Sequence, residues 1–257
     1  MLAPSRRNRI MQKLREQKQI TVKDTAREMN ISVGTLRNDL KVLEEEGFLT
    51  RTHGGAILPK TFEKEFSFIS RSETNIDEKR AIGKEALKLI EGKNCIIIDA
   101  SSTGMELAKL LLDYKHLTVI TNGLVTAQLL SQNPHITVII VGGVVRTGSS
   151  EVEGLLGQSL LSQIHADLFF TSAHGFTSDL GMTEFSIYEA ELKKAMGANA
   201  DQIVVLMDHT KIGRKSIASS IEPSDIDVFI TSKKSDSTFL NYLEEQHQIN
   251  VVTAKIE

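Results

Sequence analysis

Apolar residues in the first sixty positions recur at helical spacing. They fall into three sets at intervals of three or four residues: Ile10, Met11 and Leu14; Val22, Ala26 and Met29; and Val33, Leu36, Leu40 and Leu43. This spacing predicts three amphipathic helices, each with one apolar face. Thr21 and Ser32 precede the second and third helices, where a hydroxyl accepts a hydrogen bond from an otherwise unpaired amide. Gly47 is the predicted stop of the third helix.

The second and third helices are joined by a tight turn at Asn30-Ile31-Ser32, which predicts a helix-turn-helix. Phe48–Arg51 and Ala56–Leu58 then flank Thr52–Gly55, and we expect a hairpin because glycines supply the positive φ of a tight turn. The result is a winged helix whose third helix enters the major groove of DNA. The predicted DNA contacts lie on the outer face of these elements: Thr21, Ser32, Gly34, Thr35, Arg37, Asn38, Lys41, Arg51, His53 and Gly54.

The rest of the chain alternates short apolar runs with helical patterns. The runs are Cys95–Ile98, Leu117–Ile120, Thr137–Val141, Leu168–Phe170, Ile203–Met207, Val228–Ile230 and Val251–Val252. A helix that begins after Asn75-Ile76-Asp77 and stops at Gly92 precedes the first run. Strands that alternate with helices predict an α/β domain with a mostly parallel sheet covered on both faces. We therefore expect a DNA-binding domain at 1–60, a linker at 61–75 and an α/β effector-sensing domain at 76–257. Three linker aromatics, Phe62, Phe66 and Phe68, are expected to pack on one of the domains.

Charge divides the chain in the same way. Residues 1–60 carry a net charge of +5 and residues 61–257 a net charge of −8. A basic segment on an acidic body is typical of a nucleic-acid-binding head, although chance clustering is the alternative. No apolar run approaches the about 20 residues that span a bilayer, and Met1–Arg9 has no apolar signal segment, so we expect a cytoplasmic protein without a membrane partner. Cys95, the single cysteine, is expected in the core, and the scattered histidines predict no metal site and no cofactor.

Polar loops follow the predicted strands, at the sheet edge where α/β proteins bind ligands. Asp99–Gly104 opens a helix and brings three hydroxyls and free amides to its N-terminus, as a phosphate site requires. Ordinary helix capping explains the same residues equally well. The other loops are Thr121-Asn122-Gly123, Gly142-Gly143 with Arg146 behind it, His174-Gly175, and Asp208–Lys211, and turn chemistry is the alternative for each.

These residues also carry a resemblance to a known family. Arg7–Leu58 resembles the DNA-binding head of DeoR-family bacterial transcriptional regulators, through Asp39-Leu40, Leu43-Glu44 and Arg51–Ala56. It departs at Asn38, where the family commonly has a second arginine; asparagine can read adenine instead. The later part resembles the family's sensor domain, which is similar in fold to ribose-5-phosphate isomerase and the CoA transferases. The matching segments are Asp99–Thr103, Thr121-Asn122, Gly142-Gly143 and Asp208–Lys211, with Ser101 and Ala173 where the family often has glycine.

The resemblance, which extends from Arg7 to Thr253, implies a repressor of a carbohydrate-catabolism operon that a phosphorylated sugar releases from its operator. The implied phosphate contacts are Ser101, Ser102, Thr103 and Lys211. The implied contacts to sugar hydroxyls or a carbonyl are Asp99, Thr121, Asn122, His174, Glu184 and Asp208, with Arg146 and Glu153 as weaker candidates. Glu153 and Glu184 equally suit solvated surface carboxylates.

Two other functions fit parts of the sequence. A carboxylate at Asp99, Glu184 or Asp208 beside a phosphate site could act as the base of a sugar-phosphate isomerase, although an isomerase has no use for a DNA-binding head. A nonspecific DNA-compacting protein is the other, and the acidic body argues against it. Winged-helix heads usually bind paired half-sites, so we expect a homodimer or homotetramer. We expect the effector to act by rotating the linker near residues 61–73.

Overall fold

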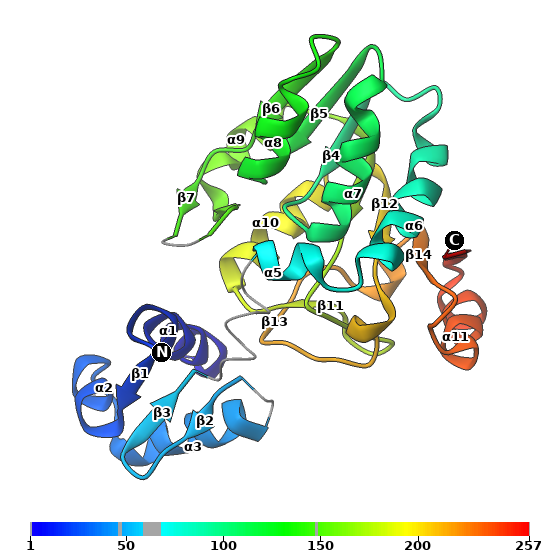
Figure 1. Cartoon of the computed structure of the whole chain (residues 1–257). Helices are drawn as coiled ribbons and strands as arrows, with labels where there is room; N and C mark the ends of the chain where they lie inside the picture. The colour runs from blue at the N-terminus through cyan, green and yellow to red at the C-terminus, as the bar shows by residue number, and fades with distance from the viewer. Residues whose placement is uncertain (1, 46–47, 59–67, 147–148, 257) are drawn as a thin grey trace.

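Two parts make up the computed structural model, a head and a sensor domain, and it describes residues 2–45, 48–58, 68–146 and 149–256 (Figure 1). The head contains α1 (Ala3–Gln17), β1 (Gln19–Thr21), α2 (Val22–Glu28), α3 (Val33–Glu45), β2 (Thr50–Arg51) and β3 (Gly55–Ile57). The strands form an antiparallel sheet in the order β1-β3-β2. The head is therefore a winged helix-turn-helix, as the apolar spacing predicted, with β1 as an additional strand.

The predicted caps and apolar faces account for the helices of the head. Thr21 Oγ1 accepts a hydrogen bond from the Asp24 amide at 3.2 Å, and Ser32 Oγ accepts one from the Thr35 amide at 3.0 Å. The inward residues of α1 and α3 are buried in one cluster: Ile10, Met11, Leu14, Leu36, Leu40 and Leu43. Val33 was wrongly placed on this face. It is 40% exposed because it is the first residue of α3, at the open end of the helix.

The wing hairpin forms, but for a different reason from the one expected. Neither Gly54 nor Gly55 has a positive φ. Gly55 is required because a Cβ atom there would lie 1.8 Å from the carbonyl oxygen of Ile20 on β1. Phe48, expected in the first strand of the wing, precedes β2 and is buried in the core of the head. Gly47 lies outside the described residues.

The sensor domain is built on a seven-stranded sheet in which every pair is parallel. Its strands are β4 (Cys95–Ile98), β5 (Leu117–Thr121), β6 (Ile136–Ile140), β9 (Ala166–Thr171), β12 (Ala200–Leu206), β14 (Val228–Ser232) and β15 (Asn250–Ala254). Each corresponds to one predicted apolar run. The order is β15-β14-β12-β9-β4-β5-β6, so the chain starts at β4, runs to the β6 edge and returns on the other side of β4. The strand order thus reverses between β4 and β9, which is where such sheets bind ligands.

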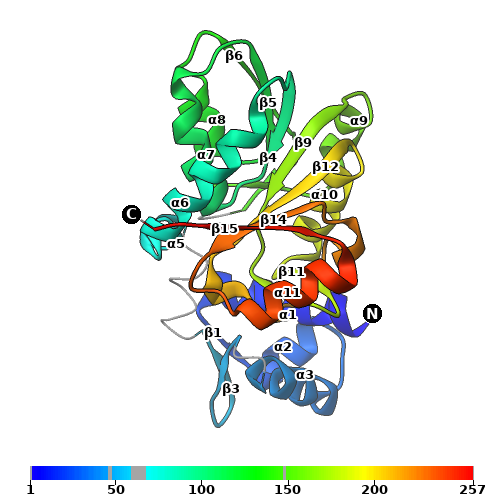
Figure 2. The same cartoon turned by 90° about the vertical axis from the view of Figure 1, so that its right-hand side faces the viewer.

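Helices cover both faces of this sheet (Figure 2). One face packs against α6 (Ile76–Leu87), α7 (Ser102–Leu110) and α8 (Leu124–Leu130), and the other against α9 (Gln158–Leu161), α10 (Ile187–Gly197) and α11 (Ser237–His247). Ile96 and Ile98 point into the first layer and Ile97 into the second, so β4 is apolar throughout. No helix among the described residues is long and apolar enough to cross a membrane.

Smaller elements lie between the strands and helices of this domain. They are η1 (Lys88–Ile90), η2 (Leu111–Asp113), β7 (Val144–Val145), β8 (Val152–Glu153), η3 (Leu155–Gly157), β10 (Gly175–Thr177), β11 (Gly181–Glu184), η4 (His209–Lys211), β13 (Ala218–Ser219) and η5 (Pro223–Asp225). Gly92, the predicted stop of the helix before β4, lies two residues after η1 and has a positive φ of 76°. The helix α5 (Phe68–Glu73) lies in the second half of the predicted linker, and Phe68 packs on the sensor core. Phe62 and Phe66 lie outside the described residues.

Candidate functional site

The candidate DNA-binding surface is the outer face of α3 and the wing. Arg37, Asn38 and Lys41 are exposed on α3, opposite the buried Leu36 and Leu40. The other predicted contacts are also exposed, apart from the half-buried Thr35: Thr21, Ser32, Gly34, Arg51, His53 and Gly54. This exposed polar and basic face has the shape and charge that a major groove accepts.

Two acidic residues on α3 hold basic residues of the head in place. Asp39 is buried and accepts hydrogen bonds from Arg6 Nε at 2.5 Å and Arg7 Nε at 3.3 Å, which ties α1 to α3. Arg51 on the wing donates from Nε to Glu44 Oε2 at 2.6 Å, and this hydrogen bond lowers the pKa of the Glu44 carboxyl. The Arg51 guanidinium is therefore already oriented beside the end of α3.

A cavity of about 250 Å³ lies at the carboxyl ends of β4 and β9. Most of the predicted effector residues line it: Asp99, Ser101, Ser102, Thr103, Asn122, His174, Asp208 and Lys211. Four predicted residues do not. Thr121 is buried and accepts a hydrogen bond from the Gly123 amide, Arg146 pairs with Glu153 at 3.2 Å, and Glu184 lies behind the cavity wall. Polar loops from distant parts of the chain thus converge as expected, but fewer of the predicted side chains reach the cavity.

Hydrogen bonds within the protein already use the polar atoms of two lining residues. Asp99 Oδ2 accepts from Thr171 Oγ1 at 2.8 Å and from the Ser172 amide at 3.0 Å, which joins the loops after β4 and β9. Asn122 accepts from the Ala100 amide at 3.0 Å and donates to a backbone carbonyl at 3.0 Å. These two residues shape the cavity by holding its loops together.

The start of α7 combines a cap with an open polar surface. Ser101 Oγ accepts from the Gly104 amide at 2.9 Å, so the capping interpretation is correct for Ser101. Ser102 and Thr103 form the first turn of α7 and line the cavity. The positive end of a helix dipole therefore faces the cavity, an arrangement that favours an anion.

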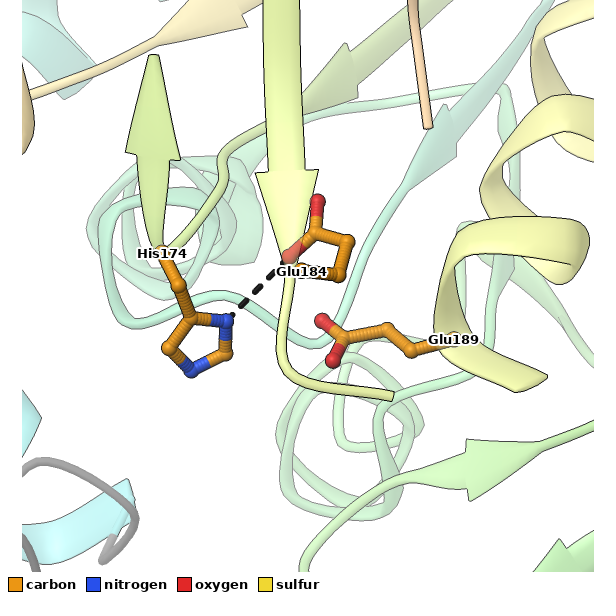
Figure 3. A group of neighbouring side chains, drawn as sticks. All are labelled: His174, Glu184 and Glu189. Carbon is orange, nitrogen blue, oxygen red and sulfur yellow. Dashed lines mark hydrogen bonds and ion pairs between the residues drawn. The ribbon is translucent and has the colours of Figure 1, made fainter. Parts of the chain in front are cut away.

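A buried cluster of ionisable groups forms one wall of the cavity. Figure 3 shows His174, Glu184 and Glu189 pointing toward one another, and His174 Nδ1 lies 3.2 Å from Glu184 Oε2. Lys193 Nζ lies 2.8 Å from Glu184 and 3.0 Å from Glu189. The potential ligand atoms of His174, Glu184 and Glu189 lie within 4.8 Å of one another, as in a metal site. The Lys193 ammonium already balances the charge of the two carboxylates, so we propose no metal here.

Burial and these contacts set the charges of the cluster. Burial lowers the pKa of His174 well below 6.5, so its imidazole is neutral at physiological pH. Burial alone would lower the pKa of Lys193, but Glu184, Glu189 and Asp99 outweigh it and raise that pKa well above its ordinary value. Burial and then Glu189 raise the pKa of the Glu151 carboxyl to about 8, so near neutral pH this group is mostly protonated and can donate a hydrogen bond.

Comparison with known proteins places both parts of the chain. A family model described as the DeoR C terminal sensor domain matches residues 74–233, and one described as the DeoR-like helix-turn-helix domain matches residues 6–62. The chain belongs to the DeoR family of transcriptional regulators. The two matched regions therefore correspond to the head and the sensor domain of the structure.

Several curated relatives align with nearly the whole DeoR-family chain. The HTH-type transcriptional regulator GolR of Listeria innocua is 48% identical over 89% of this chain and 90% of its own length. The HTH-type transcriptional repressor GlcR of Bacillus subtilis is 32% identical over 96% of this chain and 95% of its own, and the glycerol-3-phosphate regulon repressor of Escherichia coli 26% identical over 96% and 98%. Relatives of this DeoR-family chain are thus named as regulators, and they give the isomerase alternative no support.

Solved structures align with only part of the chain. A ribose 5-phosphate isomerase A from Neisseria gonorrhoeae is 14% identical with a TM-score of 0.38, over 52% of each chain. A second D-ribose-5-phosphate isomerase structure, in complex with phospho-erythronic acid, is 19% identical with a TM-score of 0.40, again over 52% of each chain. These values are too low to carry an argument.

The sequence interpretation missed several residues of this DeoR-family cavity. They line its walls from α5, the start of α6, the β8 and β9 loops, α10 and the loop after η4: Arg71, Thr74, Asn75, Lys79, Glu151, Ser172, Glu189, Lys193 and Arg214. Arg71 was missed because its segment was interpreted as a linker. Glu189 and Lys193 are spaced four residues apart on α10, a helical i, i+4 acid–base pair that the sequence did show.

Proposed function

We propose that this DeoR-family regulator represses a carbohydrate-catabolism operon and that a phosphorylated sugar bound in the cavity releases it from operator DNA. We further propose that it acts in the cytoplasm, on the chromosome. The single observation that carries the proposal is the cavity at the sheet reversal, which joins the N-terminal turn of α7 and basic side chains to a wall of neutral hydrogen-bonding groups. Relatives named as repressors, among them a putative aga operon transcriptional repressor of Escherichia coli O157:H7, support the sign of regulation.

The chemistry of the walls supports a ligand with a charged end and a neutral end. Ser102, Thr103 and Lys211 suit a phosphate group, because helix amides and an ammonium both favour anions. The neutral imidazole of His174 and the protonated carboxyl of Glu151 suit sugar hydroxyls, since each both donates and accepts hydrogen bonds.

A short segment connects this cavity to the DNA-binding head. Phe185 follows β11 and is buried among the core residues of the head, where its ring centroid lies 5.2 Å from that of Phe48. On its other side, Phe185 lies 4.2 Å from the ring of His174, which lines the cavity. A ligand that displaces His174 therefore acts on a side chain inside the head. This contact supports coupling through the β11–α10 segment in addition to the predicted rotation at residues 61–73, most of which lie outside the described residues.

The regulator acts as a homodimer or homotetramer in this proposal. A winged helix of this size reads one half-site, and pairing two heads multiplies affinity and specificity. Sedimentation of the free protein and of its DNA complex gives the number of chains in each.

Expression of a reporter tests the sign of regulation. The promoter upstream of the gene cluster that encodes the protein is fused to a reporter in strains with and without the gene. We expect higher expression in the deletion strain, and growth on the inducing carbohydrate should then have no further effect. Lower expression in the deletion strain would show activation instead.

Two further assays separate the alternative functions. Incubation of the purified protein with aldose and ketose phosphates should give no interconversion; turnover would support the isomerase. Titration at several salt concentrations with operator and scrambled DNA should show preference for the operator at every concentration. Equal affinity for both would support nonspecific compaction.

A further inference from the structure

The β6 side of the sensor domain carries an exposed apolar surface, which we call the apolar edge. Six side chains form it: Ile140, Val144, Val145, Leu155, Leu156 and Tyr188. Leu156 is 77% exposed, and the other five are between 40% and 50% exposed. They come from the end of β6, from β7, from η3 and from the first turn of α10. Figure 1 shows β7 beside β6, on the side of the domain opposite α11.

Close contacts make the apolar edge one continuous surface. A Cβ atom on Gly157 would lie 2.6 Å from the carbonyl oxygen of Gly142, so η3 lies directly against the chain that follows β6. The guanidinium carbon of Arg146, which follows β7, lies 5.2 Å from the centre of the Tyr188 ring and so joins β7 to α10. A contiguous apolar patch on the surface of a folded chain marks an interaction site.

The two edge strands of the sheet differ in charge. Two exposed lysines, Lys233 and Lys255, flank β15, and charges beside an edge strand oppose its pairing with another chain. The segment Ile136–Val145, by contrast, contains no charged residue. Among the described residues, β6 pairs with β5 alone. The β6 edge therefore lacks the protection that the β15 edge has.

Charge favours a second copy of the chain as the partner. Residues 61–257 carry a net charge of −8, so two sensor domains repel each other over much of their surfaces. The apolar edge is neutral, because the Arg146 guanidinium forms an ion pair with Glu153 at 3.2 Å. A neutral surface can face an identical surface across a two-fold axis without like-charge repulsion.

The size of the apolar edge suits the centre of a dimer interface. Six side chains that are about half exposed present roughly 300 Å² of apolar surface. A stable dimer buries about 800 Å² on each chain, with an apolar centre inside a polar rim. The apolar edge can form that centre, and the exposed Gln158 and Ser159 directly after η3 begin the rim.

We propose that the apolar edge binds the same surface of a second copy of the chain and thereby pairs the DNA-binding heads. The inference rests on the proposed function, since it names the surface that forms the proposed homo-oligomer. Glu153 Oε2 on β8 accepts a hydrogen bond from Ser186 Oγ at 2.8 Å, and the preceding residue, Phe185, is buried in the core of the head. Pairing at the apolar edge therefore constrains the two heads relative to each other.

The substitution Leu156→Asp tests this surface, because Leu156 is so exposed that an aspartate there leaves the fold of one chain intact. Val144→Lys on β7 is a second variant with the opposite charge. Tyr242→Asp is the matched control: Tyr242 is a half-exposed residue of α11, beside the β15 edge. Sedimentation equilibrium of the full chain over a range of concentrations measures the dissociation constant of each variant, and circular dichroism checks that each is folded.

We expect the wild type and Tyr242→Asp to associate with the same dissociation constant. Leu156→Asp and Val144→Lys should raise that constant roughly hundredfold or more, because each change occurs twice in a two-fold interface and places a charge in its apolar centre. Hydrogen exchange gives a second readout. Amides of residues 136–145 and 152–157 should exchange more slowly as the wild-type concentration rises, whereas those of residues 250–254 should not change.

Three results would overturn the inference. If Leu156→Asp and Val144→Lys, both folded, associate as tightly as the wild type, the chains pair through another surface and the proposed homo-oligomer stands. If Tyr242→Asp weakens association equally, added charge acts without regard to its position. If the wild type stays monomeric at every concentration, both free and on DNA, the inference and the proposed homo-oligomer both fail, and the apolar edge is left for a different protein.

Discussion

Replacing Phe185 with leucine should uncouple the effector cavity from the DNA-binding head. Leucine keeps an apolar side chain in the head core but removes the two ring contacts that Phe185 makes among the described residues, with Phe48 at 5.2 Å and His174 at 4.2 Å. Each aromatic pair contributes about 0.5–1.5 kcal/mol, so the two contacts together carry about 1–3 kcal/mol. That range equals a typical allosteric coupling free energy, which changes affinity by about 5- to 150-fold. The two contacts are therefore large enough to account for the whole regulatory response.

Fluorescence anisotropy on operator DNA, with and without effector, measures this coupling. We expect Phe185→Leu to bind DNA within about threefold of the wild type without effector, and to lose most of the effector-induced shift. Phe176→Leu is the matched control, because Phe176 is a fully buried aromatic of the sensor core that contacts Phe229. Among the described residues, Phe176 belongs neither to the core of the head nor to the cavity lining. The reasoning is refuted if Phe185→Leu keeps the full effector response, or if Phe176→Leu loses it to the same extent.

Three further predictions concern the wing, the cavity and the DNA contact. Gly55→Ala should destabilise the head by about 2 kcal/mol or more, because its Cβ would meet a β1 carbonyl at 1.8 Å, whereas Gly54→Ala has nothing within 4 Å and should be neutral in urea unfolding. The folded-state pKa of Glu151, about 8, lies above its ordinary 4.5, so this group stabilises the protein below about pH 4.5 and the contribution is lost as pH rises to about 8. Glu151→Gln should flatten that part of the stability profile, and an unchanged slope would show that Glu151 titrates normally. Arg37→Ala should weaken operator binding by about 1–3 kcal/mol in anisotropy titrations, with the exposed sensor-domain variant Lys194→Ala unchanged; equal losses would indicate a nonspecific charge effect.

Apolar periodicity was sufficient to predict the architecture. All seven apolar runs became strands of one parallel sheet, because strands buried on both faces are apolar throughout and therefore conspicuous. The helix caps could also be predicted from the sequence, since Thr21 and Ser32 each accept a hydrogen bond from an amide only three residues further along. Sequence patterns thus predicted the features that depend on residues close together in the chain.

The errors concern contacts between distant segments. Gly55 was assigned to turn geometry, whereas a carbonyl on β1 forbids any side chain there. Glu184 was expected to touch the ligand, but it is held behind the wall by Lys193, nine residues further along the chain. Lys79 was not identified, because neither its burial nor its place in the cavity lining is visible before α6 is placed beside the cavity.

The central claim is that one chain joins specific DNA binding to the sensing of a phosphorylated sugar. Its most direct test is an anisotropy titration on DNA from upstream of the gene's own cluster, at one fixed salt concentration, repeated with a panel of sugar phosphates and the corresponding free sugars. The account predicts specific binding and a weakening of that binding, about 5- to 150-fold, by one phosphorylated sugar and not by its unphosphorylated form. Specific binding that no sugar phosphate alters, or that the free sugar alters equally, would contradict it.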